Sequence, residues 1–294
     1  MRTTLQDLLA SGKTIIADGG MGTMLFALGL ARGESPERWN VERPDSVRRV
    51  HRSYIEAGAQ IVLTNSFGGN RLRLGMHGLS DRAAELNTAA ARLARAEADA
   101  ADHPVVVGGS MGPTGRMLAP MGDLEFADAA AVFEEQARAL AEGGVDVFWI
   151  ETMSDLEEVR AAVDGSRTTA PDVPVVTTLT FDTRGRTMMG VTPEKALTTL
   201  SQFDVAALGA NCGNGPDELE TAIARMRAVD ASATLIAKAN AGLPHMDGDV
   251  TVYDATPEVM AEYAVRVRNL GAQIIGACCG STPDHIRAIS RALS

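Results

Sequence analysis

The stretch Ala-Gln-Ile-Ile-Gly-Ala-Cys-Cys-Gly-Ser-Thr-Pro, residues 272–283, contains the unit from which the fold is built. Its first part, Ala272–Ala277, is a near-continuous apolar run, typical of a strand buried on both faces of a parallel sheet. A glycine-containing turn follows. Thr282-Pro283 then predicts the start of a helix, because the threonine hydroxyl can accept from free N–H groups and proline fits the first turn. The stretch therefore predicts one strand, turn and helix.

The same unit recurs along the whole chain. Two further helices are predicted to begin at Thr192-Pro193 and Thr256-Pro257. The apolar runs that predict strands are Thr14–Asp18, Gln60–Thr64, Pro104–Ser110, Val145–Glu151, Pro174–Phe181, Val205–Asn211, Ala233–Lys238 and Ala272–Ala277. Eight such units in 294 residues favour an α/β fold of the closed (β/α)8 TIM barrel type over an open doubly wound sheet. We expect one domain over residues 1–294.

Composition excludes several classes of protein. The chain has 27 basic and 38 acidic residues, a net charge of −11, which argues against binding to nucleic acid or to an anionic membrane. Three cysteines do not form a secreted disulfide framework. Residues 1–7 do not resemble a signal peptide, and the longest stretch without charge, 269–283, is too short to cross a bilayer. We expect a soluble cytoplasmic protein, and a homo-oligomer is compatible with the sequence.

Polar residues gather where the predicted strands end. In chain order these ends carry Asp18, Thr64-Asn65, Ser110, Glu151, Asp182, Asn211-Cys212, Lys238 with Asn240, and Cys278-Cys279. In a barrel the carboxyl ends of the strands form one rim, so the contrast with the apolar strand bodies predicts an active site there. The segment 29–44 is long for a loop between a strand and its helix, which predicts a functional loop.

All three cysteines stand at these strand ends. Three thiolates that meet at one point, with a fourth position open, predict a catalytic zinc site formed by Cys212, Cys278 and Cys279. One alternative is that they are buried small apolar residues. A vicinal Cys278–Cys279 disulfide is disfavoured by strain and by a reducing cytosol. A structural zinc site would need a fourth protein ligand, and we interpret the neighbouring His285 as a helix-surface or capping residue.

Charge indicates the chemistry of such a centre. Zinc with three thiolates has a net charge of −1, so it is poorly suited to making hydroxide, yet it can bind a further thiol and hold it as a nucleophilic thiolate. This favours alkyl transfer to a thiol. Asp18 opens a glycine-rich turn and could recognise a substrate ammonium together with Glu151, or simply form an Asp-Gly turn. A glycosidase carboxylate pair is disfavoured because the seventh strand ends in Lys238-Ala-Asn240.

Seven motifs carry a resemblance to a known family. They are Asp18-Gly-Gly-Met-Gly-Thr23, Thr64-Asn-Ser-Phe-Gly68, Gly112-Pro-Thr-Gly115, Glu151-Thr152, Gly209-Ala-Asn-Cys-Gly213, Asn240-Ala-Gly-Leu-Pro244 and Gly276-Ala-Cys-Cys-Gly-Ser-Thr-Pro283. Their order resembles that of the zinc-dependent homocysteine S-methyltransferases over essentially the whole chain. Ser281 and Ala277 depart mildly from the family pattern, and Thr152 cannot supply the tyrosine oxygen that some betaine-using relatives offer the metal.

The resemblance implies a role for each matching residue. Cys212, Cys278 and Cys279 would bind Zn²⁺. The amino-acid end of homocysteine would be held and surrounded by Asp18, Gly19, Gly20, Asn65, Glu151 and Asn211. The implied reaction is methyl transfer from a donor to the homocysteine thiolate, which gives methionine.

The methyl donor is a separate question. Because one barrel fills the chain, we expect no attached folate or cobalamin domain. Segments 25–29, 37–40, 181–190 and 236–240 look most like bacterial betaine–homocysteine methyltransferases, which implies a small onium donor, with glycine betaine favoured over S-methylmethionine and dimethyl-sulfonium compounds.

Few residues suggest where a donor would bind. Trp39 could hold an onium cation on its ring face or could anchor its own loop, whereas Trp149 is predicted to fill the barrel. Lys238, Arg184 or Arg186 could bind a donor carboxylate. Two alternatives stay open, namely the homocysteine half of a split cobalamin-dependent methionine synthase and a non-catalytic zinc-binding or redox-sensing barrel.

Overall fold

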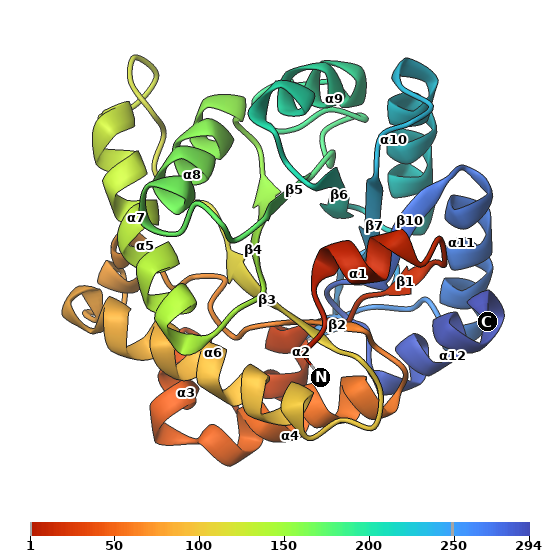
Figure 1. The fold of residues 1–294 in the computed structure, drawn as a ribbon, viewed down its shortest axis with the longest axis horizontal. Helices are drawn as coiled ribbons and strands as arrows, with labels where there is room; N and C mark the ends of the chain where they lie inside the picture. The colour runs from red at the N-terminus through yellow and green to blue at the C-terminus, as the bar shows by residue number, and fades with distance from the viewer. Residues whose placement is uncertain (1, 248–249) are drawn as a thin grey trace.

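The computed structural model describes residues 2–247 and 250–294. Figure 1 shows a central ring of strands with the larger helices outside it. The ring strands are β1 (Ile15–Ile16), β2 (Ile61–Leu63), β3 (Val106–Met111), β4 (Val147–Met153), β5 (Val175–Leu179), β6 (Ala207–Cys212), β7 (Leu235–Ala239) and β10 (Ala272–Ala277). The helices are α1 (Leu5–Ala10), α2 (Met21–Ala27), η1 (Pro36–Arg38), α3 (Trp39–Glu42), α4 (Pro44–Glu56), α5 (Arg71–Gly75), η2 (Ser80–Arg82), α6 (Ala83–Asp99), α7 (Phe126–Gly143), α8 (Leu156–Thr169), α9 (Pro193–Leu200), η3 (Ser201–Phe203), α10 (Pro216–Val229), α11 (Pro257–Asn269) and α12 (Pro283–Leu293).

The eight strands form one parallel sheet that closes on itself. Their order is β1-β10-β7-β6-β5-β4-β3-β2, and the two ends of this series meet where Ala17 forms a parallel bridge with Ile61. The Asp18 N–H donates to the carbonyl of Ile61 at 3.0 Å and reinforces this closure. The predicted (β/α)8 barrel is therefore confirmed.

Each predicted strand overlaps an observed one, and β10 has the predicted bounds. The main differences lie at the carboxyl ends. β4 continues to Met153, two residues beyond the predicted end at Glu151, and β6 includes Cys212. Candidate site residues thus lie within the sheet rather than only in the loops after it, so backbone pairing fixes their positions.

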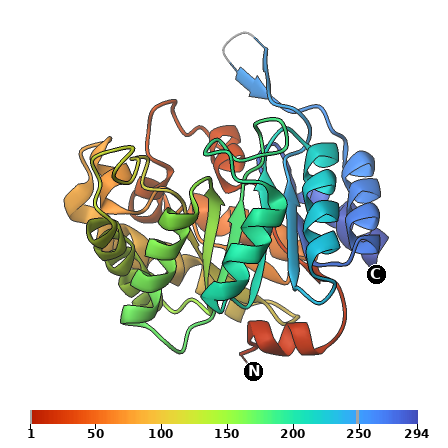
Figure 2. The ribbon, with the colours of Figure 1, turned by 90° about the horizontal axis from the view of Figure 1, so that it is seen from above.

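The barrel interior is packed with large apolar side chains. Trp149 is fully buried there among residues such as Val106 and Ile236. This confirms the prediction that Trp149 fills the barrel interior. Leu5 and Leu8 of α1 belong to the same cluster. Figure 2 shows α1 beneath one end of the barrel, so this amphipathic helix closes the end opposite the rim.

The predicted helix starts are also observed. The hydroxyls of Thr192 and Thr256 accept from N–H groups in the first turns of α9 and α11, and Thr282 caps α12. His285 completes a capping box with Thr282, and its Nε2 lies 2.9 Å from the carbonyl of Ala255. The interpretation of His285 as a capping residue is therefore confirmed.

Two segments differ from expectation. The segment 29–44, predicted as a loop, contains η1 and α3, where Pro36 occupies the first turn and Trp39 is buried. An antiparallel hairpin of β8 (His245–Asp247) and β9 (Val250–Val252) follows β7 and projects beyond the end of the barrel opposite α1 (Figure 2). Among the described residues, no helix combines the length and apolarity needed to cross a bilayer.

Candidate active site

The three cysteines meet at the rim. Because β6 and β10 both pair with β7, the carboxyl ends of these two strands lie close together. The sulfurs of Cys212, Cys278 and Cys279 lie within 4.8 Å of one another, and 2.9 Å separates the sulfurs of Cys212 and Cys278. Cys212 has a φ of 58°, an unusual left-handed backbone that is often found at functional sites.

This group of sulfurs fits a zinc ion. Zinc–sulfur bonds are about 2.3 Å long, so one ion could contact all three sulfurs with small side-chain rotations. Hydrogen bonds from Cys212 and Cys278 lower the pKa of Cys279, whereas the hydrogen bond with Cys278 raises the pKa of Cys212. The cluster therefore holds one negative charge readily and opposes a second, and a divalent cation would relieve that repulsion.

Two of the alternatives to an open zinc site, the vicinal disulfide and the structural site with a fourth protein ligand, find no support in the geometry. All three cysteines are free thiols, so the vicinal disulfide is not formed. Both ring nitrogens of His285 already lie within hydrogen-bond distance of other groups, which leaves none for a metal. Within 2–247 and 250–294, no His, Asp or Glu joins the three cysteines as a further candidate ligand.

A buried ion pair lies next to the sulfurs. Lys238 Nζ donates to Asp18 Oδ1 at 2.7 Å, and the backbone N–H of Leu63 donates to Oδ2 of the same carboxylate at 2.7 Å. Both charged side chains are about 1% exposed. Burial opposes the charge on Lys238, but the carboxylates of Asp18 and Glu151 outweigh it and raise the pKa of the lysine. The lysine therefore carries a positive charge at the floor of the site.

Breaking this pair should destabilise the fold. Lys238→Met leaves the Asp18 carboxylate buried without its cation, so we expect a loss of about 3–5 kcal/mol in the free energy of unfolding. Adding Asp18→Asn should recover most of this loss, and the exposed Lys195→Met is the control. Urea denaturation measures the free energy of unfolding of the native chain, of the two single variants and of the double variant. Equal stability of Lys238→Met and the native chain would contradict an energetically coupled pair.

Glu151 lines the cavity at the strand ends, unlike Asp18. It is 7% exposed and accepts from the Ser110 hydroxyl at 2.5 Å. Burial raises the pKa of Glu151 to about 7, although the nearby Lys238 opposes this shift. A substrate ammonium beside Glu151 would favour its ionised form, so this residue is suited to binding a cation.

Asn211 joins several strand ends into one network. Its Oδ1 accepts from the Thr152 N–H at 2.9 Å and from the Thr178 hydroxyl at 2.8 Å. Its Nδ2 donates to the Thr152 hydroxyl at 2.7 Å and lies 3.4 Å from Glu151 Oε2. Thr152 has a φ of 60°, which is strained for a β-branched residue. Asn211 therefore holds the backbone next to Glu151 in its unusual conformation.

Gly19 and Gly20 allow the first rim loop to approach the cysteine turn closely. A Cβ on Gly19 would lie 2.4 Å from Ser281 Oγ, and one on Gly20 would lie 2.8 Å from the carbonyl of Cys278. The Gly20 N–H donates to Ser281 Oγ at 3.0 Å. Both glycines line the site cavity, and larger residues would collide with the turn that carries the cysteines.

Asn65 ties the segment after α2 to the end of β2. Its Nδ2 donates to the Pro36 carbonyl at 2.8 Å and to Asn40 Oδ1 at 2.9 Å. Trp39, in the same segment, is 1% exposed, stacks with Arg43 and does not line the cavity. The structure thus brings Asn65 to the site and places the ring of Trp39 in the core.

One cavity of about 470 Å³ contains the three sulfurs, Glu151 and Lys238, whereas Asp18 lies behind Lys238. Sequence reasoning placed Thr64 and Ser110 at the predicted rim but gave no site role to several other lining residues, which are Met21, Gly22, Pro36, Glu37, Leu63, Ser66, Phe67, Gly68, Arg73, His77 and Thr152. Glu37 and Arg73 could not be found from the strand ends, because they stand within helical turns. Tyr253 is a neighbour of the cysteine turn that sequence reasoning also missed. A Cβ on Gly280 would lie 2.2 Å from the Tyr253 ring. Burial and the nearby Cys279 raise the pKa of the Tyr253 hydroxyl.

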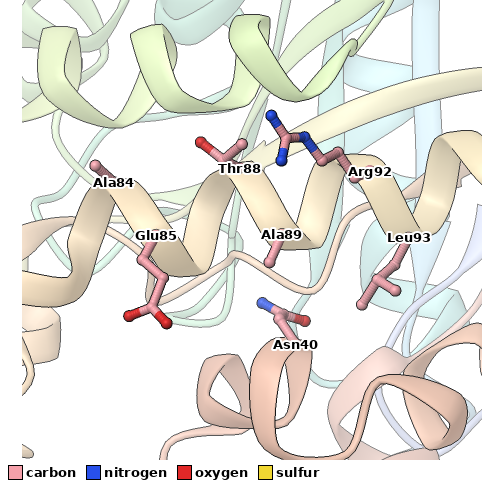
Figure 3. Close-up of a pocket in the computed structure, with 7 residues that line it drawn as sticks. All are labelled: Asn40, Ala84, Glu85, Thr88, Ala89, Arg92 and Leu93. Atoms are coloured by element: carbon pink, nitrogen blue, oxygen red, sulfur yellow. The ribbon is translucent and has the colours of Figure 1, made fainter.

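A second hollow lies on the outside of the barrel between α3 and α6. It measures about 550 Å³, and Figure 3 shows that α6 supplies nearly all of its lining, including Glu85 and Arg92. This hollow shares no residue with the cavity that contains the sulfurs. The two cavities are therefore separate.

Comparisons with known proteins agree with this geometry. The family model described as homocysteine S-methyltransferase matches residues 15–293. Proteins called methionine synthase from Mycobacterium tuberculosis (strain ATCC 25618 / H37Rv) and Mycobacterium leprae (strain TN) are 35% and 34% identical across 99% of this chain. The match covers 25% of each relative, so the chain spans about a quarter of their length.

Solved structures give the same fold. The homocysteine methyltransferase MmuM from Escherichia coli superposes in its oxidized form with a TM-score of 0.83 and in its metallated form with a TM-score of 0.81. Both are 24% identical to this chain, and the superpositions cover 99% and 98% of it and 99% of each structure. From the family model and the mycobacterial relatives together, this chain belongs to the homocysteine S-methyltransferase family.

Proposed function

We propose that this chain, as one homocysteine-binding barrel over residues 1–294, transfers a methyl group from a small onium donor to the sulfur of homocysteine and forms methionine. The observation that carries this proposal is the meeting of three free cysteines and the buried carboxyl group of Glu151 in a single cavity. Such a cavity can hold a thiol at one end of an amino acid and an ammonium at the other. Cys212, Cys278 and Cys279 would bind a zinc ion, which supplies the charge that keeps the substrate thiol deprotonated.

The remaining residues would position homocysteine. We propose that Glu151 binds the ammonium, and that the backbone of Gly19 and Gly20 contacts the amino-acid end where these glycines line the cavity. Asp18 does not line the cavity and is paired with Lys238, so its contribution would be to fix that lysine. Asn211 would act by holding Thr152 and Glu151 in place.

The transfer itself requires alignment rather than acid–base catalysis. The sulfur forms a bond to the methyl carbon while the bond from that carbon to the donor nitrogen or sulfur breaks, and its electron pair stays with the donor. The donor loses its positive charge in this step, so a cavity that excludes water avoids stabilising the starting cation. Holding the two reactants in line supplies much of the remaining acceleration.

The donor is tested directly by methionine formation. We expect zinc-loaded protein to form methionine from homocysteine with at least one of glycine betaine, S-methylmethionine and a dimethyl-sulfonium compound, without cobalamin. Betaine is the donor that we favour from the sequence. Removing zinc with a chelator should abolish turnover, and restoring zinc should recover it.

A second candidate function follows from the relatives called methionine synthase. The barrel could activate homocysteine for a methyl group delivered by a methylated corrinoid on another domain or protein. In that case no free onium donor works in the assay above, whereas a methylcorrinoid does. That result would overturn the onium proposal and leave homocysteine activation intact.

A non-catalytic zinc-binding or redox-sensing barrel predicts a different outcome. Zinc-edge X-ray absorption with and without homocysteine distinguishes the two. We expect one additional sulfur neighbour of zinc when homocysteine is present, because the cysteines supply three. Unchanged sulfur coordination would contradict catalysis.

A further inference from the structure

The cavity extends beyond the sulfurs to a group of residues with no role so far. Glu37, Phe67, Arg73 and His77 line the same cavity as Cys212, Cys278 and Cys279. We call these four residues the outer subsite. They come from η1, from the loop after β2 and from α5 with the turn that follows it, so three separate segments converge there.

Glu37 is a buried carboxylate without a cationic partner. It is 5% exposed, and it accepts from the Gly68 N–H at 2.7 Å and from the Ser35 hydroxyl at 2.5 Å. No Lys, Arg or His in the described part of the chain forms an ion pair with it. A buried carboxyl group without a cationic partner is costly, and these two hydrogen bonds offset part of that cost. A cation that enters the cavity would complete its environment.

The two glycines of the Gly112-Pro-Thr-Gly115 turn make room for the side chains of Phe67 and Arg73. A Cβ on Gly112 would lie 2.5 Å from the ring of Phe67, so the ring rests directly on this backbone. A Cβ on Gly115 would lie 2.9 Å from Arg73 Nη1. The turn after β3 therefore packs against both the Phe67 ring and the Arg73 guanidinium, and both residues line the cavity.

Arg73 is a cation without an acidic partner in the regions that the structure describes. Its recorded side-chain hydrogen bond is a weak one, at 4.0 Å, to the sulfur of Met76. Glu37 and Arg73 line one cavity and yet are not paired with each other. Two opposite charges held apart leave space for a molecule that carries both charges.

We propose that the outer subsite binds the methyl donor as a zwitterion, with its positive part against Glu37 and Phe67 and its carboxylate on Arg73. A carboxylate and an aromatic face both favour an onium or ammonium group, and a guanidinium favours a carboxylate. The inference rests on the proposed methyl transfer, because it gives that reaction its second substrate. It selects donors that carry a carboxylate over simple onium cations.

The first test is direct binding, which does not depend on turnover. Zinc-loaded protein with homocysteine is titrated calorimetrically with dimethylsulfoniopropionate, which carries both charges, and with trimethylsulfonium, which lacks the carboxylate. We expect Arg73→Gln to weaken the binding of dimethylsulfoniopropionate about tenfold or more and to leave the affinity for trimethylsulfonium unchanged. Glu37→Gln should weaken the binding of both sulfonium compounds about tenfold or more. Arg71→Gln, on the same helix but paired with Glu135 and half exposed, is the matched control.

The outcomes separate this inference from the proposed function. The outer subsite is overturned if neither Arg73→Gln nor Glu37→Gln changes donor binding. It is also overturned if Arg71→Gln changes donor binding as much as Arg73→Gln does. Either conclusion holds even if methionine is formed. Binding that follows the expected pattern without methionine formation keeps the subsite and contradicts the onium reaction. Homocysteine affinity should stay within about twofold in both variants, because the proposal assigns the homocysteine ammonium to Glu151 and only the donor to the outer subsite. If Glu37→Gln fails to fold, the partly exposed Arg73→Gln still decides the carboxylate arm.

Discussion

Cys212→Ala is expected to abolish zinc binding and methyl transfer while the barrel remains folded. Removing one of three thiolates leaves two ligands, too few for a stable zinc site, so the metal content should fall from about one ion per chain to near zero. Methionine formation should decrease by about a thousandfold or more, because the substrate thiol is no longer held as a thiolate. Elemental analysis, circular dichroism and the methionine assay measure the three quantities.

The fold should survive because the cysteines lie outside the packed core. The barrel interior is filled by residues such as Trp149, Val106 and Ile236, and none of the three cysteines belongs to that cluster. Asn214→Ala, two residues after Cys212 and exposed, is the control and should keep full metal content. A large loss of thermal stability on chelation or in Cys212→Ala would instead identify a structural zinc site.

The fold could be predicted because each strand repeats the same local signals. Apolar runs such as Ala272–Ala277 lie between helices that begin with Thr-Pro, and these signals act within a few residues of each other. The meeting of the three cysteines followed from topology, since both cysteine turns come after strands that flank β7. Knowledge of the barrel was therefore sufficient to bring the three sulfurs together before any coordinates.

The parts that failed depend on contacts between distant segments. Trp39 was considered for a donor cation because it lies in a long segment near the rim, but packing buries it in the core. Lys238 could not be recognised as the partner of Asp18, because 220 residues separate them and the pair forms only when β1 and β7 share a barrel. The outer residues Glu37 and Arg73 carry no local signal, since charged residues in short helical turns are usually solvated.

Product binding should become tighter as pH rises through about 7, and Glu151 should be the cause. Burial raises the pKa of this carboxyl to about 7, well above its ordinary value of 4.5. Below that pH the group is protonated and cannot attract the ammonium of methionine. Above it the group is ionised, and the contact becomes charge-assisted. Calorimetric titration of methionine from about pH 6 to about pH 8 should show this increase.

The same shift has a consequence for the free protein. A carboxyl whose folded pKa is raised binds its proton more tightly in the native state, so its contribution to stability is complete below 4.5 and is lost as pH rises through about 7. The size of this loss is about 3 kcal/mol. Glu151→Gln should remove it, and its unfolding free energy should change less than that of the native chain between about pH 5 and about pH 8.

Proton counting makes the assignment to Glu151 specific. When the methionine ammonium binds beside a half-protonated Glu151, the carboxyl ionises, so native protein should release up to about half a proton per ligand near pH 7. Glu151→Gln should release none and should bind methionine about a hundredfold more weakly at about pH 8. Titrations in buffers of different ionisation enthalpy measure the release. Equal release from both proteins would assign the titration to another group and would remove Glu151 from the ammonium contact.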